Sequence, residues 1–179
     1  MRDFIFRVID KNDQVVEIQF PYVIVVSQDC DLNWAVKPSI PEQEQKPIEH
    51  HQFLPNVLLL PAFPSEHVRG GQHLVEVFNV MQKKISSDSW KELKQNRNER
   101  YHFLDAAASI QVPELVLDFK LYYTVPFSLV QEKHKECYLA TVNELFRERL
   151  SQRFLAFFGR FALPVIRESV AATTDNGSL

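Results

Sequence analysis

The sequence predicts one α+β domain: a small, strongly bent antiparallel barrel with a helical insertion at about 73–98 and a C-terminal helix packed on it. Three observations lead to this fold class. Apolar and polar residues alternate near the N-terminus, helical spacing recurs in the insertion, and the last element carries a long apolar stripe. The chain has 179 residues and can bury a core of its own. We assign residues 1–167 to the domain and expect residues 168–179 to form a disordered tail.

The first element is predicted to be a β-hairpin. Residues 3–9 and 14–20 flank Asp10–Asp13, whose Asp and Asn side chains tolerate turn geometry. Two apolar runs follow, Val23–Val26 and Val57–Pro61, and both are typical of buried strands. A long proline-rich segment joins the two runs, so we expect neighbouring strands with a surface loop between them.

The middle of the chain is predicted to contain two helices and two further strands. Apolar spacing favours a helix over residues 73–85, although local alternation leaves a strand open. Ser87 or Asp88 can cap a second helix, from Ser89 to about Asn98. The strands are expected at Tyr101–Leu104 and Glu114–Val125.

The C-terminal element is predicted to be an amphipathic helix from Asn143 to Ala162. Thr141 and Glu144 fit a capping box, in which each side chain bonds the other residue's free backbone amide. The apolar stripe behind them consists of Phe146, Leu150, Phe154, Phe157, Phe158 and Phe161. Burying each such side chain contributes about 1.5–3 kcal/mol, so we expect the stripe to lie in the core or in an interface.

Composition is that of a soluble cytoplasmic protein. The net charge is −3, no apolar run reaches the length of a membrane span, and the N-terminus has no signal-peptide core. Only Cys30 and Cys137 are present, without a Cys-x-x-Cys pair, so we expect reduced thiols and no cysteine-based zinc site. We expect no other metal, no cofactor and no membrane partner.

The candidate chemical groups follow the Val23–Val26 strand in a polar turn that contains Ser27, Gln28, Asp29, Cys30 and Asp31. If the strand continued, Asp29 and Asp31 would point to one face and could hold a divalent metal. Asp also caps turns through backbone amides, and we favour this structural explanation. Cys30 could act as a nucleophile beside a histidine such as His102, but a lone buried cysteine is the commoner case.

A basic segment at residues 83–102 is a candidate for binding nucleic acid or a protein partner. Six Lys/Arg oppose three acids there, a balance of +3. The six are Lys83, Lys84, Lys91, Lys94, Arg97 and Arg100. Because Trp90, Tyr101 and His102 are interleaved, the segment could bind single-stranded nucleic acid through phosphate contacts and base stacking. An ordinary solvated helix face is the alternative, and we give it more weight.

Three parts of the chain resemble the PemK/MazF-like family in pattern and order. They are Tyr22-Val-Ile-Val-Val-Ser-Gln-Asp29, Val57-Leu-Leu-Leu-Pro61, and Tyr101–Thr124 with the terminal helix. Members are small SH3-like barrels that serve as growth-inhibiting endoribonucleases in prokaryotic toxin–antitoxin loci. The resemblance implies an SH3-like barrel and a protein partner from the same locus, with RNA or DNA as a further ligand. A homodimer is left open.

The chain departs from this family where catalysis is expected. The family's arginine before the strand is missing from Gln19-Phe20-Pro21-Tyr22, and Phe63 stands near the place of its Thr or Ser. Without these groups, cleavage would lose electrostatic stabilisation of the transition state. We therefore expect a binding subunit of a toxin–antitoxin or phage-defence locus, with a degenerate catalytic site. The alternative is an endoribonuclease that uses replacement residues from the set Ser27, Asp29, Asp31, Arg100 and His102.

Overall fold

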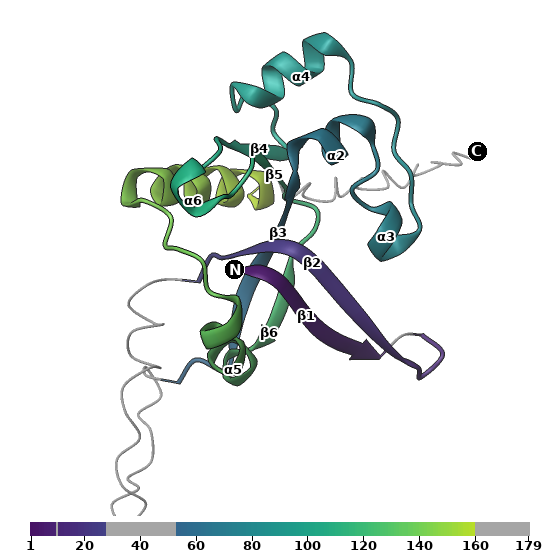
Figure 1. Ribbon diagram of the computed structural model, residues 1–179, viewed down its shortest axis with the longest axis vertical. Helices are drawn as coiled ribbons and strands as arrows, with labels where there is room; N and C mark the ends of the chain where they lie inside the picture. The colour runs from purple at the N-terminus through teal and green to yellow at the C-terminus, as the bar shows by residue number, and fades with distance from the viewer. Residues whose placement is uncertain (10, 28–52, 160–179) are drawn as a thin grey trace, which may run out of the picture.

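The computed structural model describes residues 1–9, 11–27 and 53–159 (Figure 1). Its strands form one antiparallel sheet in the order β1-β2-β3-β5-β4, with β6 also paired to β3. The strands are β1 (Arg2–Ile9), β2 (Val15–Val25), β3 (Asn56–Pro64), β4 (Tyr101–Leu104), β5 (Leu115–Asp118) and β6 (Tyr123–Pro126). The helices are α2 (Ser65–Gly70), α3 (Val75–Phe78), α4 (Ser87–Lys94), α5 (Phe127–Cys137) and α6 (Glu144–Phe158), with a 3-10 turn η3 at Ala108–Ile110.

The α+β class and the antiparallel sheet are confirmed, but the SH3-like barrel is not. Among the described strands, β1 and β4 end the sheet and do not pair with each other, so the sheet stays open. Helices flank the sheet, and α6 lies beside β4 and β5 (Figure 1). No helix in the described part of the chain has the length and apolar character needed to span a membrane.

Strand β3 organises the sheet because it pairs with three other strands. One edge pairs with β2 along Leu59–Ala62, while the other pairs with β6 along Asn56–Leu59 and with β5 along Ala62–Pro64. Its side chains alternate between two cores: Leu59 faces the core shared with the hairpin, and Leu60 faces the core beneath α6. Burial on both faces explains why this strand is a continuous apolar run.

The predicted hairpin is present, and its second strand is longer than expected. Phe4 pairs with Phe20 and Phe6 with Ile18, and all four side chains are buried in one core. Because β2 runs through Pro21 to Val25, the apolar run that we predicted as a separate strand is the end of this one. The predicted neighbouring strand is β3, and it does lie beside β2.

The predicted helix over residues 73–85 is wrong in extent. The structure has only α3, which ends at Asn79 in the left-handed conformation, with φ of 51°. Asparagine tolerates this conformation and terminates helices for that reason. The second helix is α4, and the Oγ of Ser86, rather than Ser87 or Asp88, accepts a hydrogen bond from the amide of Ser89.

The predicted long strand at Glu114–Val125 is two strands, β5 and β6, that pair with different halves of β3. The chain turns between them so that Phe119 is fully buried in the core beneath α6. The capping box is also wrong, since Asn143 accepts the hydrogen bond from the Leu145 amide at 3.2 Å. In the apolar stripe, Leu150 and Phe154 are buried and Phe146 is 48% exposed. Phe161 and the predicted tail lie outside the described residues.

Candidate functional site

Of the polar turn after β2, only Ser27 lies within the described residues; Gln28, Asp29 and Asp31 lie outside them. The Ser27 hydroxyl accepts a hydrogen bond from the Leu58 amide at 3.0 Å. The carbonyl of Leu58 accepts one from the Val26 amide at the same distance. Ser27 therefore extends the pairing of β2 with β3 by one side-chain contact, which is a structural role.

His102 is a core residue beneath α6. Its side chain is 1% exposed, and its ring packs on Phe119 with centroids 6.2 Å apart. Burial lowers the pKa of His102 to about 4, and the positive charges of Arg153 and Arg149 act in the same direction. The imidazole is thus neutral at pH 7 and is a weak base.

The structure does not bring Ser27 and His102 together. Ser27 follows β2 and His102 lies on β4, and β3 and β5 run between these two strands. Three strand spacings separate them by about 14 Å. A serine and a base must lie within hydrogen-bond reach to act as a pair, so these two residues do not form a catalytic pair.

Arg100, a candidate binding residue, is held by a buried carboxylate. Its Nε donates to Asp118 Oδ1 at 2.7 Å and its Nη2 donates to the other carboxylate oxygen. Asp118 is 1% exposed, and it also accepts a hydrogen bond from the Lys120 amide at 3.1 Å. This bidentate bond raises the pKa of Arg100 above its ordinary value. The guanidinium joins β4 to the end of β5 and is already bound.

Of the other candidate cations, one has an ion pair and four have none among the described residues. Lys94 donates to Glu114 at 3.2 Å, and Ser65 donates to the second oxygen of that carboxylate at 3.1 Å. The four cations that are solvent-exposed and have no ion pair among the described residues are Lys83, Lys84, Lys91 and Arg97. The interleaved aromatic rings of Trp90 and Tyr101 are buried, so neither ring is available to stack on a base.

Arg153 of α6 points into the protein. It donates hydrogen bonds to the carbonyl oxygens of Asn96, Asn98 and Tyr101, the last at 2.9 Å. These three acceptors lie in the segment that leads from α4 into β4. Arg153 therefore links α6 to this segment.

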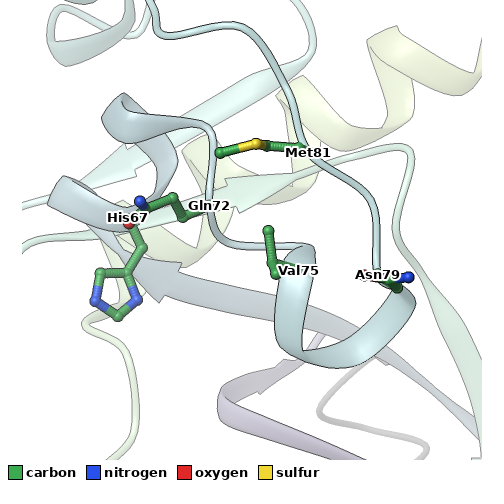
Figure 2. Close-up of a pocket in the computed structure, with 5 residues that line it drawn as sticks. All are labelled: His67, Gln72, Val75, Asn79 and Met81. Atoms are coloured by element: carbon green, nitrogen blue, oxygen red, sulfur yellow. The ribbon is translucent and has the colours of Figure 1, made fainter.

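A groove of about 370 Å³ lies between α2, α3 and the segment that follows α3 (Figure 2). We call it the Met81 groove; it is lined by His67, Gln72, Val75, Asn79 and Met81. Met81 is 72% exposed and Val75 is 38% exposed. The sequence interpretation missed this groove because it predicted a helix over residues 73–85, a range that includes Met81. Asn79 and the pair Gly70-Gly71 were the signals for a shorter helix and a tight loop.

The described residues contain no group of three His, Cys, Asp or Glu side chains placed to hold a metal ion. Comparisons with known proteins place the chain in no group: no family model matches it, and neither a curated protein nor a solved structure does.

Proposed function

We propose that this protein is a non-catalytic, PemK/MazF-like binding subunit that holds a protein partner from its own prokaryotic toxin–antitoxin or phage-defence locus. One observation carries the proposal: the described candidates for catalysis already serve the fold. Ser27 completes strand pairing, Arg100 neutralises a buried carboxylate, and His102 is buried in the core.

Metal-independent RNA cleavage needs a base and a charge-stabilising donor close to one phosphate. Withdrawing Arg100 for that purpose would leave Asp118 buried without its partner, which is costly. Charging His102 would place a cation among Arg149, Arg153 and the apolar core beneath α6. The energetic costs of these changes favour binding over cleavage.

Protein is a better supported ligand than single-stranded nucleic acid. The exposed cations Lys83, Lys84, Lys91 and Arg97 are interspersed with Asp88, Glu92 and Glu99. Four cations against three acids make a weak field for phosphates, and the neighbouring Trp90 and Tyr101 rings are buried. The Met81 groove, in contrast, leaves the apolar side chains of Val75 and Met81 exposed for a protein partner to cover.

The test is to co-express the full chain with the products of its neighbouring genes and to measure the mass of the purified species by light scattering. We expect a stable complex, and intact RNA after incubation of the purified chain with single-stranded RNA. Cleaved RNA that disappears in the Asp29→Ala and Asp31→Ala variants, but not in an Asp105→Ala control, would show an endoribonuclease and overturn the proposal.

A further inference from the structure

We propose that the Met81 groove is the docking site for an acidic segment of a partner protein, in which an apolar residue enters the groove and acidic residues follow along Lys83 and Lys84. This inference rests on the proposed binding function and specifies the chemistry of the partner.

The groove is held in shape by backbone hydrogen bonds. The amide of Gln82 donates to the carbonyl of Gly71 and the amide of Ile85 to that of Arg69, each at 3.0 Å. The Tyr101 hydroxyl also donates to the Gln82 side chain at 3.1 Å. These bonds attach the segment after α3 to the end of α2. A preformed groove of this kind loses little conformational entropy when a ligand binds.

Gly71 makes this closure possible. Its φ of 77° belongs to the left-handed region, and a Cβ atom there would lie 2.2 Å from the carbonyl oxygen of Gln82. Any other residue would push the two segments apart. The loop thus needs glycine for its close approach, and it presents Val75 and Met81 toward one space (Figure 2).

The apolar lining suits an apolar anchor residue. Met81 and Val75 are both exposed, and so is Val80, the residue between Asn79 and Met81. Methionine has a flexible, polarisable side chain and adapts to partner surfaces of different shape. The volume of about 370 Å³ lies within the range of ordinary ligand pockets. The other three lining residues, His67, Gln72 and Asn79, carry polar groups that can bond the backbone of a peptide.

The charge beside the groove sets the rest of the partner's chemistry. Lys83 and Lys84 follow Met81 directly, are exposed, and have no ion pair among the described residues. The acidic residue nearest in sequence, Asp88, lies in the first turn of α4, and Glu66 is exposed on α2 next to His67. The partner's carboxylates are therefore expected along the Met81–Lys84 segment, with its apolar anchor between Met81 and Val75.

The test uses synthetic peptides as probes with the full chain. Each peptide carries one leucine or phenylalanine followed by three glutamates, three glutamines or three lysines, and binding is followed by amide shifts of the ¹⁵N-labelled protein. We expect the glutamate peptides to bind about fivefold to tenfold more tightly than the lysine peptides at low salt. The shifts should centre on Gly71, Val75 and Met81.

Substitutions should then separate the two contributions. Met81→Asp should abolish binding of all peptides, and Lys83→Glu with Lys84→Glu should invert the preference toward lysine flanks. The matched control, Lys91→Glu with Arg97→Glu, reverses two exposed charges on and after α4 and should leave the preference unchanged. All substituted side chains are exposed, and the amide spectrum of each variant confirms its folding.

Four results with the probes would overturn the inference, and a fifth result comes from the partner of the locus. The four are no peptide binding at millimolar concentration, a preference that the Lys83/Lys84 reversal does not invert, an oligonucleotide that displaces the peptide, or self-association that Met81→Asp abolishes. The last would assign the groove to a second copy of this chain. If the partner from the locus still binds the Met81→Asp variant, the inference fails while the proposed function stands; RNA cleavage would instead remove the proposed function.

Discussion

Two regions of this molecule use basic side chains in opposite ways. Beneath and beside α6, Arg100 and Arg153 are turned inward and bonded to a buried carboxylate and to backbone carbonyls. At the Met81 groove, Lys83 and Lys84 are exposed and unpaired among the described residues. The arginine fork can satisfy several fixed acceptors at once, while lysine is a strongly hydrated point charge. Basic residues close together in the sequence can thus have different roles: some form internal hydrogen bonds and others are exposed to solvent.

The largest expected effect comes from breaking the buried ion pair between Arg100 and Asp118. Asp118→Asn should lower the free energy of unfolding by about 3 kcal/mol, because Arg100 then loses its charged partner at a buried site. Urea denaturation measures this loss. Glu114→Gln removes the partner of Lys94 at a partly exposed site and should cost less than about 1 kcal/mol. Equal losses in the two variants would contradict the distinction.

The next effect is acid destabilisation through His102. Its pKa is about 4 in the folded protein, below the ordinary value of 6.5, so the unfolded chain binds the extra proton between these values. This stability is fully present above about pH 6.5 and is lost as the pH falls toward 4, by about 3 kcal/mol in total. Burial also lowers the pKa of His73, which acts with the same sign.

Urea denaturation at pH 7.5 and at pH 4.5 measures this effect. In a His102→Gln variant, the loss of stability between the two pH values should be smaller than in the parent by most of that amount. An unchanged loss would mean that His102 is not buried in its neutral form.

At the groove, the backbone rather than a charge should control stability. Gly71→Ala should lower the free energy of unfolding by about 2 kcal/mol, since alanine is strained at this φ and meets the Gln82 carbonyl. Gly70→Ala is the matched control, because its Cβ would come no closer than 3.8 Å to the Gln72 side chain. It should change stability by no more than about 0.5 kcal/mol. Thermal denaturation measures the stability of both variants, and equal losses would contradict the prediction.

The smallest expected effect is at the exposed lysines. Replacing Lys83 and Lys84 together by alanine should change the free energy of unfolding by less than about 0.5 kcal/mol, because neither side chain has a described partner. Arg153→Ala, by contrast, leaves three carbonyls without their donor and should cost about 2 kcal/mol. If the lysine variant were the less stable one in urea, the groove cations would have a structural role.

Much of the fold could be predicted from residue patterns. Local patterns of apolar residues predicted four elements: the hairpin, the β3 strand, the strand at Tyr101–Leu104 and the terminal helix. Element ends were missed where single side chains decide them, as at Asn79 and Asn143. The helix at Phe127–Cys137 was not predicted at all, and the closed barrel was not confirmed.

The sequence by itself determined the hairpin, the β3 and β4 strands, the terminal helix and the presence of a basic segment, because side-chain periodicity and charge are local properties. Only the tertiary structure decided that β3 pairs with both β5 and β6, that Asp118 is buried under Arg100, and that Met81 is exposed. Each of these outcomes depends on residues distant in sequence competing for the same buried space. The polar side chains at the end of a strand and the cations of a helix therefore acquire their roles only when the packed chain shows which of them are already bonded.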